Sequence, residues 1–302
     1  MASTIIGPMT TSASAEPFAA LAAHHLPREA AARWTALLRP CARLTAATEG
    51  GTAAPAVATL GGVPLLPAGT AWPEWSGRGP LSFIASVDCA ALPRDGVAAA
   101  FPDSGTLLFF FFDGQVDDAE AFVFVDDPDT WAGARVLYVP AGTAVSPAAV
   151  PGELEPYKRV ELTASARISA PDPWHPQSEQ ALATERIAPH LPHLQPAPVQ
   201  AFIKALSKLD GDIGHQIGGH AAPVQGPVEY EVAHALLGGR KAGIDAARTD
   251  AEAQRWVLLA QFDSDDDANM MWGDCGALYW LIRPEDLAAR RFEAAMFTWQ
   301  CC

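Results

Sequence analysis

Short apolar runs bounded by Asp, Gly or Pro dominate the pattern of hydrophobic and polar positions along the chain. Such runs are typical of strands, because a strand buries a few successive residues before the chain turns. The most apolar run opens at Gly105, is rich in phenylalanine and ends at Asp113. In the first half, the pattern predicts five strands, at 81–88, 105–113, 121–125, 135–139 and 159–168.

Other stretches repeat their apolar residues at spacings of three and four, which is the period of an amphipathic helix. This spacing predicts helices at 27–44, 178–190 and 198–209. The Ala/Ser/Thr-rich residues 1–16 are expected to form a disordered lead. The Pro-rich stretch 171–176 is expected to be a linker.

The second half repeats the order of features found in the first. An aspartate ends the central strand in both copies, and a Gly-Gly pair precedes it. A repeat this long favours a duplicated domain over a solenoid. We therefore predict an α+β fold, built from an internally duplicated unit of mainly antiparallel strands with flanking helices. Residues 17–302 are expected to form one domain of two pseudo-repeats, at about 45–170 and 198–302. The matching segments are Gly61-Gly62 with Gly218-Gly219, 84–88 with 259–263, and 105–109 with 276–280.

Several motifs occur together from Gly61 to the end of the chain. They are Gly61-Gly62-x-Pro64-x-x-Pro67, Trp72-Pro73, Pro80-Leu81-x-Phe83-Ile84-Ala85-x-Val87-Asp88, Gly105-x-Leu107-x-Phe109-Phe110, His215-Gln216-x-Gly218-Gly219 with Gln225, Leu258-Leu259-x-Gln261-x-Asp263-Ser264-Asp265, Trp272-Gly273-Asp274-x-Gly276-x-Leu278-Tyr279 and Gln300. This combination resembles the YwqG-like family of bacterial proteins, a domain of unknown function. The resemblance implies a duplicated α+β unit and implies no reaction. The chain departs from the family at Ser86, where glutamine is usual, and at His220, where an aromatic residue is more usual.

Charge and composition narrow the possible partners. The 302 residues include 35 acidic and 20 basic ones, for a formal net charge of -15. This charge repels phosphate backbones and anionic membranes, so we expect neither nucleic acid nor membrane as a partner. A cationic, metal or peptide partner stays open, as does a role of the charge in solubility alone.

The sequence also predicts a cytoplasmic location. The longest apolar run, 107–112, is too short to span a bilayer, and residues 1–16 lack the pattern of a secretory signal. Five cysteines, two of them adjacent at Cys301-Cys302, form neither a disulfide framework nor a zinc signature.

The segment from Asp263 to Asp274 is a candidate metal loop. Counted from Asp263, carboxylates fall at positions 1, 3, 5 and 12, as in an EF-hand loop; these are Asp263, Asp265, Asp267 and Asp274. Hard oxygen ligands in a tight loop suit a divalent cation. Position 6, however, is Ala268 where the turn of an EF-hand needs glycine. The alternative is a solvated hairpin loop.

A second candidate region contains glycines, amides and aromatic residues in turn-like contexts. His215 could act as an acid, a base or a ligand, or it could be a buried histidine that holds a turn. Tryptophans in such loops line a binding groove or cover the end of a hydrophobic core. His175, His190 and His193 could together form a metal site. The commoner alternative is that His190 and His193 are simply a pair of surface side chains. The predicted ligand-binding residues are His215, Gln216, Gly218, Gly219, Gln225, Trp272 and Trp72.

These features favour a ligand- or protein-binding module, of an interaction, regulatory or immunity type, with a polar pocket in the C-terminal half. Its partner would be a protein or a small molecule. The alternative is a metal-assisted enzyme that uses the aspartates and His215, with a divalent cation as cofactor. A ligand-free scaffold is the third interpretation. The sequence has neither the G-x-S-x-G nor the His-Glu-x-x-His hydrolase signature.

Overall fold

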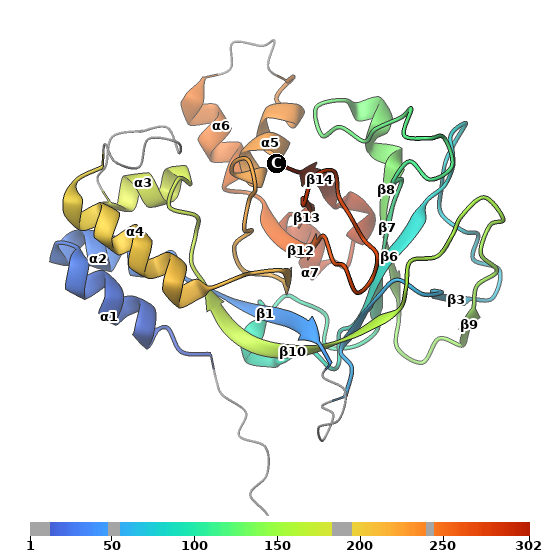
Figure 1. Cartoon of the computed structure of the whole chain (residues 1–302), viewed down its shortest axis with the longest axis horizontal. Coiled ribbons are helices and arrows are strands. Elements are labelled where there is room, and N and C mark those ends of the chain that lie inside the picture. The colour runs from blue at the N-terminus through green and yellow to red at the C-terminus, as the bar shows by residue number, and fades with distance from the viewer. Residues whose placement is uncertain (1–12, 48–54, 183–194, 240–244) are drawn as a thin grey trace, which may run out of the picture.

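The computed structural model describes residues 13–47, 55–182, 195–239 and 245–302. A curved, antiparallel sheet of ten strands dominates it, in the order β14-β13-β12-β11-β1-β10-β2-β6-β7-β8 (Figure 1). In chain order the strands are β1 (Arg39–Ala46), β2 (Ala58–Leu60), β6 (Ser82–Asp88), β7 (Thr106–Phe111), β8 (Ala134–Val139), β10 (Val160–Ser169), β11 (His215–Ile217), β12 (Val257–Asp263), β13 (Ala277–Ile282) and β14 (Met296–Gln300).

Helices and short ribbons flank this sheet, so the predicted α+β class is confirmed. The helices are α1 (Glu16–His25), α2 (Arg28–Thr35), α3 (Pro176–Leu182), α4 (Ala197–Asp210), α5 (Val228–Leu236), α6 (Ala246–Ala253) and α7 (Pro284–Ala288). The ribbons pair β3 (Leu65–Pro67) with β9 (Val145–Pro147) and β4 (Glu74–Trp75) with β5 (Gly79–Pro80). None of the helices in the described ranges is both long and apolar enough to cross a membrane.

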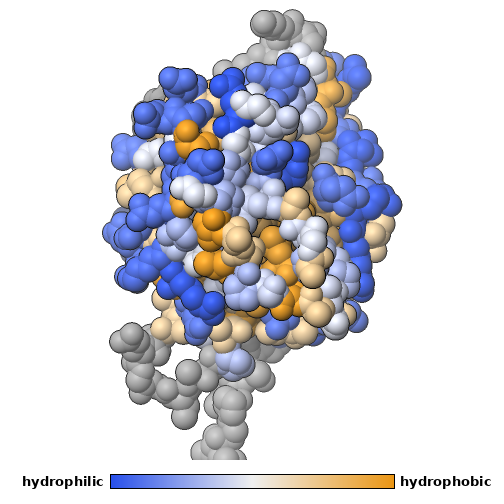
Figure 2. All heavy atoms as spheres, turned by 90° about the vertical axis from the view of Figure 1, so that its right-hand side faces the viewer, coloured by the Kyte–Doolittle hydropathy of each residue, from blue (hydrophilic) through white to orange (hydrophobic). Residues whose placement is uncertain are grey.

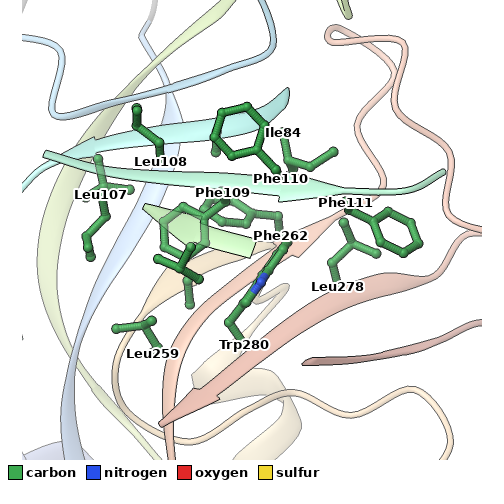
Figure 3. Packing of buried hydrophobic residues seen from close by; sticks show 14 of the residues in the cluster. Ile84, Leu107, Leu108, Phe109, Phe110, Phe111, Leu259, Phe262, Leu278 and Trp280 are labelled. Carbon is green, nitrogen blue, oxygen red and sulfur yellow. The ribbon is translucent and has the colours of Figure 1, made fainter. Parts of the chain in front are cut away.

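The main core forms where the Phe-rich strand β7 meets the strands of the C-terminal half. The ring of Phe109 lies 5.1 Å from that of Phe262 and 5.1 Å from that of Trp280, and the three side chains point toward one another (Figure 3). All three are almost fully buried. Full burial of side chains of this size contributes about 1.5–3 kcal/mol each. This packing joins the two halves of the chain into one core.

A second, smaller core lies under the helices at the left of Figure 1. Trp34 of α2 packs edge-to-face on Phe202 of α4, with ring centroids 4.8 Å apart. Helix α5 lies instead beside α6 and the edge strand β14. Strand β14 is a terminal strand of the sheet, and α5 packs next to it.

The sheet has the same irregularities on both sides of its centre. The register shifts between Phe83 and Ala85 where β6 pairs with β7, and between Leu258 and Ala260 where β12 pairs with β13. At the centre, β1 pairs with β10, and Thr45 lies opposite Thr163 with their hydroxyl oxygens 3.5 Å apart.

Two sequence predictions of elements are wrong. The helix predicted over 27–44 ends at Thr35, and β1 begins at Arg39. Proline lacks an N–H and clashes inside a helix, so Pro40 cannot continue the apolar period as a helix. The strand predicted at 121–125 is irregular chain, in which the N–H of Phe124 binds the Thr130 hydroxyl in place of a neighbouring strand.

Other predictions fall partly outside the described residues. This holds for residues 1–12 of the predicted lead, for residues 183–190 of the helix predicted at 178–190, and for His190 and His193. The described remainder of the lead runs directly into α1, which begins at Glu16.

Candidate functional site

The four aspartates of the predicted metal loop are not gathered together. Asp267 and Asp274 are exposed, whereas Asp263 and Asp265 are half-buried. Among the described residues, no three His, Cys, Asp or Glu side chains form a group that could hold a metal ion. Asp265 instead holds a tight turn, in which its backbone pairs with Met270 and its Oδ1 accepts from the N–H of Ala268 at 2.7 Å.

His215 is buried in β11 and uses both ring nitrogens. Its Nδ1 accepts from the backbone N–H of Asp263 at 3.1 Å, so the ring proton lies on Nε2. Nε2 then donates to Oδ2 of Asp265 at 3.1 Å. The hydrogen bond from His215 lowers the pKa of Asp265, whereas burial raises the pKa of Asp263. This histidine therefore holds the start of the aspartate loop against β11.

A row of buried polar side chains crosses the C-terminal half of the sheet. Gln216, Gln261, Tyr279 and Thr298 lie opposite one another on β11, β12, β13 and β14. All four are buried. Gln216, Gln261 and Tyr279 bond residues within 218–227, which we call the covering segment, whereas Thr298 bonds Glu231 of α5.

The covering segment obtains several of its hydrogen bonds from these side chains, and at its start the N–H of Gly218 donates to the carbonyl of Leu259 on β12 at 3.2 Å. Gln216 Nε2 donates to the carbonyls of Gly218 and His220, both at 2.8 Å. Gln261 Oε1 accepts from the N–H of Ala222 at 2.9 Å, and the Tyr279 hydroxyl donates to the Ala222 carbonyl at 2.9 Å. Buried backbone groups must be paired, so the amides replace a missing strand neighbour.

Gln300 continues this arrangement at the end of β14. Its Oε1 accepts from the N–H of Gln225 at 2.8 Å, and its Nε2 donates to Gly226 and to Glu231 at 2.8 and 2.9 Å. The exposed Gln225 donates from Nε2 to the carbonyl of Cys301 at 2.6 Å. Gln225 is therefore both an edge cap of β14 and a surface residue.

The remaining predicted ligand-binding residues have packing and turn roles. Trp72 and Trp272 donate from Nε1 to the carbonyls of Leu81 and Asp263, at 2.8 and 3.2 Å. Gly218 and Gly219 both have positive φ, +67° and +77°. A Cβ on Gly219 would lie 2.5 Å from Ser169 Oγ, whereas a Cβ on Gly218 would meet nothing within 4 Å.

A second buried polar cluster lies where α5 meets the start of β1. His220 Nε2 donates to the carbonyl of Leu37 at 2.7 Å, and His175 Nε2 lies 3.9 Å from Glu229 Oε2. Burial lowers the pKa of His175 to about 4 and that of His220 to about 3, and it raises the pKa of Glu229. Burial therefore favours the neutral form of each of these groups, while the nearby Arg39 guanidinium favours the charged form of Glu229 and the neutral form of the two histidines.

The polar pocket of the C-terminal half lies elsewhere, on the outer edge of β14. It has a volume of about 440 Å³ and lies between α5, residues 123–126 and residues 298–301. We call it the β14 pocket. Of the predicted ligand-binding residues, the structure places Gln225 in its lining and not the other six.

One wall of the β14 pocket is polar and the other aromatic. On the α5 side, Glu231 and His234 line it, and the Thr298 hydroxyl donates to Glu231 Oε2 at 2.7 Å. On the opposite side lie Phe124 and Trp299. Phe124 is 50% exposed, and its neighbour Phe122 stacks on Trp299 with ring centroids 6.4 Å apart.

A larger pocket, of about 570 Å³, lies between α1, the end of α4 and the centre of the sheet. Arg43 lines it but is already paired, because its guanidinium contacts Asp210 at 3.3 Å and the carbonyl of Asp212 at 3.1 Å. Figure 2 shows further apolar surface in the middle of the face that lies at the right of Figure 1, the side of the β3–β9 ribbon. Leu65 and Val145 of that ribbon are exposed, but they do not line the β14 pocket.

The fold and site define an α+β protein with a pocket on the edge of an antiparallel sheet. The model of a family described as a domain of unknown function (DUF1963) matches residues 58–301. This match covers most of the chain, and the chain belongs to that family. No curated protein matches the chain as a relative.

Most residues of the β14 pocket escaped the sequence reasoning. Phe124 lies in a stretch predicted as a strand, and Glu231 and His234 lie on a helix that was not predicted. Gln300 lines the pocket and belongs to the last of the sequence motifs, so that motif was the available indication of this site. Nothing in the sequence indicated that Gln225 and Gln300 meet residues 123–126.

Proposed function

We propose that this protein is a binding module and that the β14 pocket is its ligand site. The observation that carries the proposal is the pocket's lining, in which hydrogen-bonding side chains oppose two aromatic ones. Ligand pockets commonly have a volume of about 300–1,000 Å³ and combine apolar walls with a few polar groups. The pocket fits this description, whereas both ring nitrogens of His215 are already used within the protein. The metal-assisted alternative has less support for that reason.

The experiment is a thermal-shift screen of small polar and amphipathic compounds against three proteins. These are the wild type, Phe124→Ala in the pocket, and Leu65→Ala as a control with the same 50% exposure on another part of the surface. A compound held at 100 times its Kd should stabilise the wild type by about 2.7 kcal/mol. The proposal expects this stabilisation to persist in Leu65→Ala and to be lost in Phe124→Ala. Equal stabilisation of all three proteins would place the ligand elsewhere.

We further infer that the domain arose by internal duplication. The strand order is consistent with this, because β1, β2, β6, β7 and β8 have counterparts in β10, β11, β12, β13 and β14 at mirrored positions of the sheet. Arg43-Leu44-Thr45-Ala46 and Glu161-Leu162-Thr163-Ala164 occupy the two central strands. In this interpretation the repeats begin at β1 and β10, so that β10 belongs to the second repeat and not, as in the boundaries expected from the sequence (about 45–170 and 198–302), to the first. Each repeat then places its first strand beside the other repeat.

We also propose the finer family and the compartment suggested by the sequence. The motifs from Gly61 to Gln300 support a place among YwqG-like bacterial proteins. Five cysteines without a disulfide framework suit the reducing conditions of the cytoplasm.

A further inference from the structure

We infer that the β14 pocket takes an extended peptide, which pairs with the outer edge of β14 and alternates basic with apolar side chains. This inference rests on the proposed function and specifies the ligand class. Its first support is the position of β14, which is a terminal strand of the sheet. Edge strands present unpaired backbone groups, to which an extended peptide can add as a further strand.

The alternation of hydrogen-bonded pairs along the strands shows which backbone groups of β14 point to the outer edge of the sheet. The N–H of Ser264 donates to the carbonyl of Gly276, and hydrogen-bonded pairs alternate along an antiparallel ladder. It follows that Tyr279 and Ala277 direct their backbone groups toward β14, where they meet Thr298 and Gln300. The backbone N–H and C=O groups of Phe297 and Trp299 therefore point away from the sheet.

The hydrogen bond of Gln225 to Cys301 agrees with this alternation of inward and outward backbone groups. Cys301 is the next residue whose backbone points outward, and its carbonyl accepts from Gln225 Nε2. A side chain thus caps the end of the edge. Trp299, two residues earlier, directs its backbone outward by the same alternation, from the terminal strand of the sheet.

The shape of the pocket follows the strand edge. Its lining includes four consecutive residues at the end of β14, 298–301, and four consecutive residues of another segment, 123–126. Successive side chains of an extended chain point to opposite faces, so a cavity that touches all four residues contacts the strand along its backbone edge. The Trp299 indole donates to the carbonyl of Val123 at 3.0 Å, which holds residues 123–126 next to the end of β14.

The two faces of the pocket specify the side chains of the peptide. A peptide strand paired with β14 would direct alternate side chains toward α5, where Glu231 is held by Thr298 and Gln300. Its other side chains would face Phe124 and Trp299. A carboxylate on one side and aromatic rings on the other suit basic and apolar residues in alternation. Asp126, which also lines the pocket, and the net charge of -15 favour a cationic partner in the same sense.

The test uses the full chain and a degenerate library of capped hexapeptides, in which Lys or Arg alternates with Val, Ile, Phe or Tyr. Binding is followed by fluorescence polarisation, and the best peptide is then resynthesised with N-methyl groups on every second residue, in both phases. We expect at least one phase to weaken binding tenfold or more, because N-methylation removes the N–H groups that pair with β14. Undiminished binding in both phases would overturn strand pairing.

Two further comparisons separate this inference from the proposed function. Glu231→Gln should weaken the best peptide at least fivefold, whereas Glu153→Gln, an exposed glutamate outside the pocket, should not; equal effects would overturn the assignment of basic side chains to Glu231. Putrescine and spermidine test for small cations. If they stabilise the wild type and not Phe124→Ala while no peptide binds, the peptide inference falls and the binding function stands. If neither class binds, and the thermal-shift screen finds no other compound, both fall.

Discussion

The Nε2 atom of His215 donates to Oδ2 of Asp265 at 3.1 Å, across the junction between β11 and the aspartate loop. The other ring nitrogen accepts from the backbone of Asp263. Two of the residues most suggestive of chemistry in the sequence are therefore bound to each other and to the local backbone. This pair ties the start of the aspartate loop to β11.

Substitution of Asp265 is expected to destabilise the fold, whereas substitution of its exposed neighbours is not. Asp265→Asn removes a charge-assisted acceptor of the His215 and Ala268 hydrogen bonds, at a cost of about 1–3 kcal/mol. Asp267→Asn and Asp274→Asn should stay within about 0.5 kcal/mol of the wild type. Urea unfolding of the chelated protein measures all three. Equal effects of the three substitutions would contradict the structural role of Asp265.

The buried glutamines should matter more for stability than an exposed glutamine. Gln261→Ala removes the partner of the Gly214 carbonyl and of the Ala222 N–H. Because both groups are only partly buried, we expect a combined cost of about 1–3 kcal/mol. The exposed Gln254 on the C-terminal side of α6 is the control, and Gln254→Ala should change the free energy of unfolding by less than about 0.5 kcal/mol. Chemical denaturation at equilibrium distinguishes the two. A Gln261→Ala protein as stable as the control would show that the covering segment is held by other contacts.

Two adjacent glycines should respond differently to alanine. Both need a positive φ, which costs a non-glycine residue about 1 kcal/mol or more. Gly219→Ala also forces its Cβ against Ser169 and Cys41, so it should destabilise by about 2–4 kcal/mol or prevent folding. Gly218→Ala meets no atom and should cost only about 1 kcal/mol. Thermal melts of both variants test this difference, and a Gly218→Ala effect as large as that of Gly219→Ala would argue against it.

Acid should weaken the fold through the buried histidines. The folded-state pKa of His220 is lowered to about 3, below the unfolded value of about 6.5, so only the unfolded chain gains this proton as the pH falls. The contribution of the buried, neutral histidine to the free energy of unfolding is complete above about pH 6.5. It declines as the pH falls, at up to about 1.4 kcal/mol per pH unit for each histidine. Glu229, whose pKa is raised, opposes this trend where it titrates.

A comparison of two variants separates the effect of His220 from those of His175 and Glu229. His220→Gln should flatten the dependence of unfolding free energy on pH between about 6.5 and 4, by roughly 1 kcal/mol per pH unit. The exposed His24 on α1 provides the control, since His24→Gln should leave the slope of the wild type unchanged. Urea titrations at a series of pH values give both slopes. An unchanged slope in His220→Gln would show that the ring takes up its proton in the folded state.

Strand β7 could be predicted because both of its faces are buried. Its phenylalanines form a short, continuous apolar run bounded by turn residues, which is typical of a fully buried strand. Residues 39–44 misled the same reasoning, since a period of three to four residues and a half-buried strand differ little over so short a stretch. At 121–125 the alternation is real, because Ala121 and Val123 are buried and Phe122 and Phe124 exposed, but no strand lies alongside to make a ladder.

By itself the sequence determined the α+β class and which residues lie in its C-terminal motifs, because apolar period and turn chemistry act over a few residues. Only the tertiary structure decided what those motif residues contact. Gln216, Gln261 and Gln300 became hydrogen-bond partners of the covering segment because that segment runs over their face of the sheet. The β14 pocket depends on residues 123–126 lying against residues 298–301, far along the chain, and no local pattern encodes such a contact.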